Sequence, residues 1–472
     1  MTTKDNKRQQ MIMNDETAET TEPWLVELLV HSDPGPLVRK HLSLAKVLAL
    51  SGACKALHEL MLDETTRARN HWADAKAEVE RVSTPRPVSH ICSENAARDG
   101  YLLMLAYLHE NGYSWNEDTC KKAAKSGHLD CLKYAHAKDC PWDEETCSQA
   151  AAHGHLRCLE YAHENGCPWD TRVCEQAAGG GHLDCLQYLH DHGCPWDEYT
   201  CYEAASYGSL ACLQYAYERG CPMEDTGTCT RAARYGKLAC LRYAHQNGCP
   251  WDYRTCREAA GNGHLDCLQY AHENGCEWDE DTCTEAARHG QLACLQYAHE
   301  NGCPWDKCTC MGAAEEGQLA CLQYLHENGC EWDCRTCNWA ARKGELDCLW
   351  YAHEHGCPWD EWTCREAAEN GHLNCLKYAH ENGCPWDEDT CHAAAEKGHL
   401  DCLQYAHEHG CPWNVTTCTC AASNGHLACL QYACEHGCSW HGWTCKMADL
   451  NNHLDCLQYL RENNCPSWER YV

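Results

Sequence analysis

One phrase repeats along most of this chain with a period of 27 residues. A clean copy runs from Cys364 to Cys391 and reads C-R-E-A-A-E-N-G-H-L-N-C-L-K-Y-A-H-E-N-G-C-P-W-D-E-D-T-C. An earlier copy has Ser93 in place of the opening cysteine, and the step before Cys229 is one residue longer. Such a period predicts a stack of similar units. The opening cysteines are Cys120, Cys147, Cys174, Cys201, Cys229, Cys256, Cys283, Cys310, Cys337, Cys364, Cys391, Cys418 and Cys445.

Each copy of the phrase predicts two short helices. Asp387 and the acidic residues after it suit a helix N-cap and first turn. The first helix should end at a glycine such as Gly398, because glycine readily adopts the left-handed conformation of a helix C-terminus. The second helix should begin at Leu373 and end at Gly383 in the equivalent unit. Helices of about ten residues are unstable alone in water. We therefore expect an all-α solenoid of fourteen stacked helix-turn-helix units.

The second half of the unit resembles a known family. The stretch from Gly371 to Gly383, with the Ala-Ala-x-x-Gly-His run before it, is similar to the ankyrin repeat. Each unit is six residues shorter than the usual 33, and the family's Thr-Pro-Leu-His opening is reduced to Thr-Cys. The resemblance thus implies ankyrin-like repeats without the usual β-hairpin fingers. It also implies that the family's buried positions are filled here by Cys364, Cys375, Leu376, Ala379, His380 and Cys384. The Cys-Pro-Trp-Asp variant resembles units expanded in large DNA viruses that infect amoebae.

The sequence before the repeats divides in two. Residues 1–22 are polar and are predicted to be a disordered tail. Residues 23–82 are predicted to form a small helical module, followed by the repeats at 91–472. The order of Leu25, Leu28 and Leu29, then Cys54 and Trp72, resembles the F-box that docks substrate receptors onto ubiquitin ligases. That resemblance implies a ligase adaptor as partner of residues 24–72. The alternative is an apolar cap that shields the first repeat.

The chain is strongly acidic, with 70 Asp and Glu against 38 Lys and Arg. Residues 1–90 are nearly balanced in charge, so the repeats carry almost all of the excess. Such a surface repels phosphate backbones, which argues against nucleic acid and favours a basic protein as partner. We find no apolar run near the roughly 18 residues of a membrane span and no signal peptide. The expected location is the cytoplasm, or the host cytoplasm if the protein is viral.

Forty-five cysteines raise the question of disulfides or metal. Equivalent cysteines of successive units should be about 8–10 Å apart, which exceeds the roughly 7 Å between Cα atoms that a disulfide allows. We therefore expect the repeated cysteines to be small buried hydrophobic residues. The alternative is zinc bound by Cys308, Cys310, Cys334 and Cys337, a C-x-C and a C-x-x-C in adjacent units. We call a set of equivalent positions in successive units a column. The cysteines outside the columns that repeat as cysteine are Cys54, Cys92, Cys308, Cys334, Cys420 and Cys434.

The repeated aromatic and histidine positions are best explained by packing. The histidine column that includes His380 is predicted to be half-buried and hydrogen-bonded. The tryptophan of Cys-Pro-Trp-Asp, such as Trp386, is predicted to pack between units. No unit combines a nucleophile, a base and an orienting group that differ from the repeated pattern. We therefore expect a protein that is not an enzyme and needs no cofactor.

Recognition should use the columns that vary from unit to unit. One region places extra Trp, Arg and Lys side chains in adjacent units. Trp and Arg dominate the energetics of protein interfaces. We therefore expect a protein-protein interaction scaffold whose candidate partner-binding residues are Trp339, Arg342, Lys343, Trp350, Trp362 and Arg365.

Overall fold

The structure, a computed structural model, describes residues 93–110, 112–223 and 225–464. Within these ranges every regular element is a helix, which confirms the all-α prediction and shows no β-hairpin finger there. The predicted tail at 1–22 and the F-box-like module or cap at 23–82 lie outside the described residues. None of the described helices is long and apolar enough to cross a lipid bilayer.

The chain divides into two compact units between Thr200 and Cys201. Helix α14 (Glu198–Tyr207) contains this division. The first unit contains α6 (Ser93–Arg98), α7 (Leu102–Glu110), α8 (Glu117–Lys125), α9 (Leu129–Ala137), α10 (Glu144–Ala152), α11 (Leu156–Glu164), α12 (Thr171–Gly180) and α13 (Leu183–Asp191).

The second compact unit continues the same alternation of first and second helices. It contains α15 (Leu210–Glu218), α16 (Gly227–Arg234), α17 (Leu238–Gln246), α18 (Tyr253–Gly261), α19 (Leu265–Glu273), α20 (Glu280–Arg288), α21 (Leu292–Glu300), α22 (Lys307–Glu315), α23 (Leu319–Glu327), α24 (Cys334–Lys343), α25 (Leu346–Glu354), α26 (Glu361–Glu369), α27 (Leu373–Glu381), α28 (Glu388–Lys397), α29 (Leu400–Glu408), α30 (Val415–Ser423), α31 (Leu427–Glu435), α32 (Gly442–Leu450) and α33 (Leu454–Glu462).

The helix boundaries follow from the capping residues that the repeat supplies. Asp387 is the N-cap of α28, and its carboxylate accepts a hydrogen bond from the backbone N–H of Asp389 at 3.0 Å. The helix ends at Gly398, whose φ of 83° is the left-handed conformation expected of a C-terminal glycine. Helix α27 begins at Leu373 as predicted and ends at Glu381, and its C-cap Asn382 is followed by Gly383 with a φ of 83°. Both predicted helices of the repeat are confirmed.

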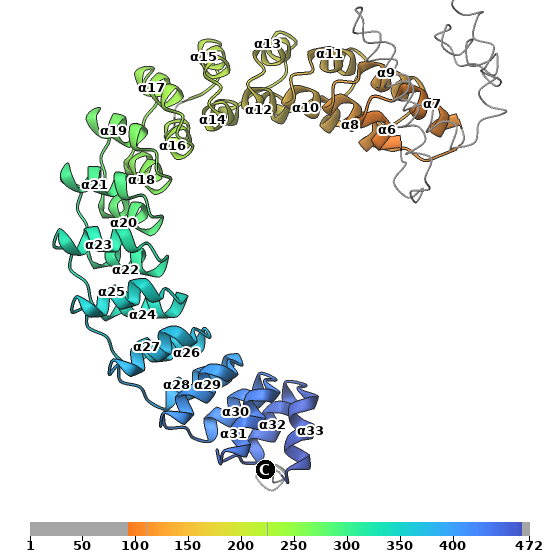
Figure 1. Cartoon of the computed structure of the whole chain (residues 1–472). Coiled ribbons are helices and arrows are strands. Elements are labelled where there is room, and N and C mark those ends of the chain that lie inside the picture. The colour runs from red at the N-terminus through yellow and green to blue at the C-terminus, as the bar shows by residue number, and fades with distance from the viewer. Residues whose placement is uncertain (1–92, 111, 224, 465–472) are drawn as a thin grey trace, which may run out of the picture. The chain divides into compact units, whose positions relative to one another are not determined.

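The core of each stack lies between the two helices of a unit and the helices of its neighbours. The first helices of successive units pack closely on one another, while the second helices pack on each other more loosely (Figure 1). The first helices can approach because the side chains that they bury are mostly small, such as Cys391, Ala394 and Ala395, which have no exposed surface. The second helix adds a fully buried leucine, such as Leu403. Each unit therefore completes its core with its neighbour's surface.

The repeated cysteines are buried free thiols in the described units from Cys120 to Cys438. Cys411, which follows the second helix, donates its S–H to the carbonyl oxygen of Asp387 at 3.1 Å. This contact joins the end of a unit to its start. A hydrogen bond with the Cys411 thiol, together with burial, raises the pKa of the Cys391 thiol. The prediction of buried cysteines is confirmed for these positions, whereas Cys445 of the last unit is buried but disulfide-bonded. The loop cysteine adds a hydrogen bond that an aliphatic side chain would lack.

Histidine, tryptophan and tyrosine form a repeated contact between units. The His380 ring stacks on Trp386 with centroids 3.8 Å apart, and Trp386 meets Tyr405 of the next unit edge-on. His380 is half-buried. The predicted packing of the repeated tryptophan is therefore confirmed, and so is the half-buried, hydrogen-bonded histidine.

The glycine between the two helices is required for two reasons. Gly371 has a φ of 76°, a left-handed conformation that other residues adopt at a cost. A Cβ atom built on Gly371 would lie 2.5 Å from Nδ1 of His399, which belongs to the next unit. The histidine that follows this glycine in each clean copy thus packs over the preceding unit's glycine.

Candidate functional site

A groove crosses two consecutive first helices, α24 and α26, in the second compact unit. Its volume is about 140 Å³. Its residues come from columns that vary between units, so the groove is specific to this step of the stack. It is lined by Arg335, Asn338, Trp339, Arg342, Trp362 and Glu366.

Two tryptophans in this region carry an arginine on the ring. The guanidinium carbon of Arg342 lies 4.7 Å from the ring centroid of Trp339. That of Arg365 lies 4.4 Å from the ring centroid of Trp362. Cation–π contacts of this length hold the aromatic and cationic groups together. Trp362 nevertheless remains 45% exposed, and Trp339 is half-buried. The groove therefore offers aromatic surface that its own arginines already hold in position.

Acidic and amide side chains fix the polar wall of the groove. Arg342 pairs with Glu366 at 3.8 Å, and Arg335 pairs with Asp333 at 3.0 Å. Burial raises the pKa of the Glu366 carboxyl, and the charge of Arg342 opposes that shift. The hydrogen bond from Arg335 holds the pKa of Asp333 below its ordinary value. Each guanidinium is thus balanced by a carboxylate of the same chain.

Asn338 connects the two helices across the floor of the groove. Its amide nitrogen donates to Asp360 at 3.0 Å, and its amide oxygen accepts from the hydroxyl of Thr363 at 2.5 Å. Asp360 is the N-cap of α26, and Thr363 is buried beneath it. The hydrogen bonds of Asn338 therefore set the position of α26 relative to α24.

The structure brings together four of the six predicted partner-binding residues. Trp339, Arg342 and Trp362 line the groove, and Arg365 stacks on Trp362 beside it. The other two lie elsewhere. Lys343 pairs with Glu315 and Glu316 of the preceding unit, at 3.7 and 3.6 Å.

Trp350 lies apart from the groove. It is 48% exposed and belongs to α25, a second helix, whereas the groove is built from first helices. Its closeness to Trp339 in the sequence therefore does not place it at the same surface.

The sequence analysis missed three residues that line the groove. Arg335, Asn338 and Glu366 occupy the same variable columns as the predicted residues, and that shared position was the available signal. A second Trp–cation pair was also missed. Trp443 is 52% exposed, and the amine of Lys446 lies 5.0 Å from its ring centroid. The sequence W-T-C-K at 443–446 repeats the W-T-C-R at 362–365.

The four cysteines considered for zinc do not form one group. Cys310 and Cys337 are buried in the core, where hydrogen bonds with the loop cysteines and burial raise the pKa of each thiol. Cys308 and Cys334 are half-buried. Over the part of the chain that the structure describes, the ligating side chains that gather are others: His392, Glu396 and Cys420.

These features define a class of protein: an all-helical repeat protein built from stacked helix pairs. The family model for ankyrin repeats in many copies matches residues 147–190 and 391–433, one stretch in each compact unit. These two stretches are therefore similar to ankyrin repeats. No curated protein matches its sequence significantly. Among solved structures, the crystal structure of the human ASB11 ankyrin repeat domain is 18% identical, covering 34% of this chain and 84% of that one, with a TM-score of 0.30.

Proposed function

We propose that this chain is a protein-protein interaction scaffold, not an enzyme, and that it holds a protein partner in the groove between α24 and α26. The observation that carries the proposal is the placement of Trp339 and Trp362 along one groove, with an arginine on each ring. The groove is presented by the same helical repeat whose copies at 147–190 and 391–433 are similar to ankyrin repeats.

A protein partner suits the groove because of the side chains that it presents. Trp and Arg are the residue types that most often dominate the binding energy of protein interfaces. An exposed ring such as Trp362 gains free energy when an apolar side chain of the partner covers it and displaces water. The ion pair between Arg342 and Glu366 gives polar groups for hydrogen bonds at the rim. The groove therefore combines an aromatic anchor with a polar edge.

The net charge of the chain favours a partner of opposite charge. The chain has a net charge of −32, so its long-range field attracts basic proteins. The arginines of the groove do not reverse this field, because Arg335 and Arg342 are paired with carboxylates of the chain. We therefore propose a basic protein that inserts an apolar or aromatic side chain between Trp339 and Trp362.

Affinity capture with the full chain tests this function. The groove variant carries Trp339→Glu and Trp362→Asp, which are the residues found at the equivalent positions Glu366 and Asp389. Substitutions that the repeat already accepts should leave folding unchanged. Trp350→Gln, which copies Gln404, is the matched control away from the groove. We expect the wild type and the control to capture the same protein and the groove variant to lose it. Equal capture by all three chains would contradict the proposal.

A further inference from the structure

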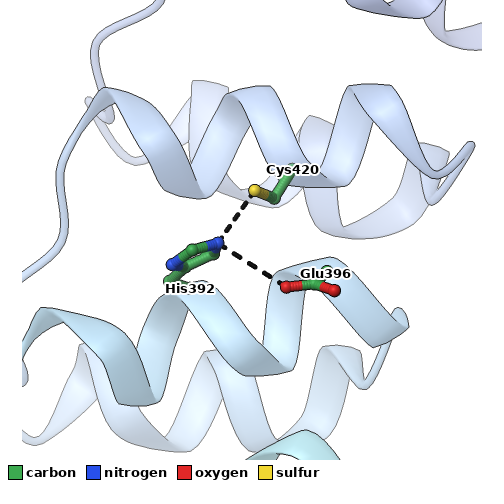
Figure 2. Close-up of side chains that lie close together, drawn as sticks. All are labelled: His392, Glu396 and Cys420. Carbon is green, nitrogen blue, oxygen red and sulfur yellow. Dashed lines mark hydrogen bonds and ion pairs between the residues drawn. The ribbon is translucent and has the colours of Figure 1, made fainter.

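Three side chains with metal-binding atoms meet between two consecutive first helices, α28 and α30. Nε2 of His392 lies 2.9 Å from Sγ of Cys420 and 3.7 Å from Oε2 of Glu396 (Figure 2). The three ligand atoms all lie within 4.8 Å of one another, and each side chain is half-buried. The cluster thus lies at the surface, within reach of an ion from solvent.

We propose that His392, Glu396 and Cys420 bind one divalent transition-metal ion, with zinc as the best fit. An imidazole nitrogen, a thiolate and a carboxylate are all ligands of zinc, with bonds of about 2.0 to 2.3 Å. Bonds of that length place neighbouring ligands of a tetrahedral site roughly 3.3 to 3.7 Å apart. The 3.7 Å distance from His392 to Glu396 lies at the upper end of this range, and the 2.9 Å distance to Cys420 lies below its lower end. Three protein ligands leave the fourth position for water or for a group from a partner.

The local geometry prepares the histidine for this role. His392 and Glu396 are four residues apart, so they share one face of α28. Oδ1 of Asp389 lies 3.7 Å from Nδ1 of His392, on the side of the ring away from the cluster. A carboxylate at the second ring nitrogen of a histidine is the usual outer partner in zinc sites, because it orients the ring and leaves Nε2 for the metal.

The glutamate also has an oxygen available. Lys397 contacts Oε1 of Glu396 at 3.1 Å, while Oε2 is the atom nearest to His392. The lysine therefore holds the carboxylate without covering the oxygen that faces the cluster. Cys420 comes from the next unit, so a bound ion would link two consecutive units through side-chain ligands.

The repeated histidine and cysteine columns do not produce this cluster. His392 and Glu396 are the first and fifth residues after the opening cysteine Cys391. Cys420 is the second residue after the opening cysteine of the next unit, Cys418. At the preceding step these positions hold Arg365, Glu369 and Ala393. At the following step they hold Thr419, Ser423 and Met447. Cys420 is one of the six cysteines outside the repeated columns. The histidine, glutamate and cysteine therefore come together between these two units because each stands at a position that varies from unit to unit.

The test is metal titration of the folded full chain after removal of metal by a chelator. Zn²⁺ binding is measured by calorimetry, and Co²⁺ binding is followed by the thiolate-to-cobalt charge-transfer absorption. His392→Thr and Cys420→Ala copy Thr419 and Ala393, so the repeat tolerates both side chains. Cys308→Thr copies Thr416 and removes a half-buried cysteine from another step. Metal-free melting temperatures report whether each variant folds as the wild type does.

We expect the wild type and Cys308→Thr to bind one ion with cysteine-to-cobalt absorption. We expect His392→Thr and Cys420→Ala to bind zinc at least tenfold more weakly, because even the loss of an outer partner of a ligand commonly weakens metal binding tenfold or more. Zinc should raise the melting temperature of the wild type and leave that of these two variants unchanged. The proposal is overturned if the folded wild type binds no zinc, or if both variants keep its zinc affinity and cobalt spectrum.

Discussion

Nδ1 of His380 lies 3.2 Å from the hydroxyl oxygen of Tyr405 in the next unit. The same contact recurs between His353 and Tyr378 at 2.8 Å. It joins the second helices of successive units, which pack more loosely than the first helices. Neighbouring units are therefore held together by a repeated side-chain hydrogen bond in addition to the buried core.

Removing the tyrosine hydroxyl should weaken this connection. We expect Tyr405→Phe to lower the free energy of unfolding by about 1 kcal/mol, the usual contribution of one hydrogen bond. Urea unfolding of the full chain, followed by circular dichroism, measures the change. Tyr459→Phe is the control, because the preceding unit has Cys434 in place of the histidine. An equal loss in both variants would show that the His380 contact adds nothing.

The histidines of this column should make stability depend on pH. Burial lowers the pKa of His380 and His407 below 6.5, and the neighbouring His409 and His436 lower it further. Between the lowered value and 6.5, the unfolded chain binds more protons than the folded chain, so stability falls as pH falls. We expect a lower melting temperature at pH 5.5 than at pH 7.5, conditions on either side of about 6.5.

A variant without the titrating groups isolates the histidine contribution to this pH dependence. His380→Gln combined with His407→Gln keeps polar side chains but removes two imidazoles. We expect its melting temperature to fall less steeply with acidification than that of the wild type. If the two slopes are the same, the lowered histidine pKa values do not affect stability.

The two glycines of a unit should respond differently to substitution. Gly371 and Gly383 both have positive φ, but an added Cβ meets His399 at Gly371 and nothing within 4 Å at Gly383. We expect Gly383→Ala to cost about 1–2 kcal/mol from backbone strain and Gly371→Ala to cost more, because His399 must also move. Thermal unfolding compares the two.

A second substitution separates the clash from the strain. His399→Ser copies Ser209, which occupies the same position in another unit. Added to Gly371→Ala, it should reduce the loss of stability to that of Gly383→Ala. An unchanged loss would mean that contact with His399 is not the cause.

The constant tryptophan column should matter for folding more than the variable one. Trp359 stacks on His353 with centroids 3.9 Å apart and meets Tyr378 of the next unit. We expect Trp359→Ala to cost roughly 2–4 kcal/mol, somewhat below the value for a fully buried tryptophan. Trp362→Ala should change the unfolding free energy by less than about 1 kcal/mol, because that ring is 45% exposed. Chemical unfolding that ranks the two in the opposite order would contradict these assignments.

The sequence alone predicts the fold well because the same capping and buried residues recur in unit after unit. An N-cap such as Asp387, a C-terminal glycine such as Gly398 and a buried Ala-Ala pair leave few alternatives to stacked helix pairs. The groove is harder to predict, since its walls come from different units. Trp339 follows its opening cysteine and Trp362 precedes the next one, so their meeting depends on how α26 sits against α24.

Separation along the sequence is also a poor guide to which side chains lie close together in the structure. Trp350 is near Trp339 in sequence but lies on a second helix, away from the groove. Conversely, His392 and Cys420 are 28 residues apart and in contact. This separation is one repeat plus one residue. It predicts a contact only when the alignment of one first helix against the next is known.

The affinity of the captured partner for four chains tests the central claim most directly. Calorimetry would compare the wild type with Trp339→Glu and with Trp362→Asp, and Trp350→Gln would serve as the exposed control. We predict that each groove substitution weakens binding by about 2 kcal/mol, roughly 30-fold, as for an interface hot spot. We predict that Trp350→Gln has no effect and that all melting temperatures stay unchanged. If both groove variants bind with wild-type affinity, the groove between α24 and α26 is not the recognition site.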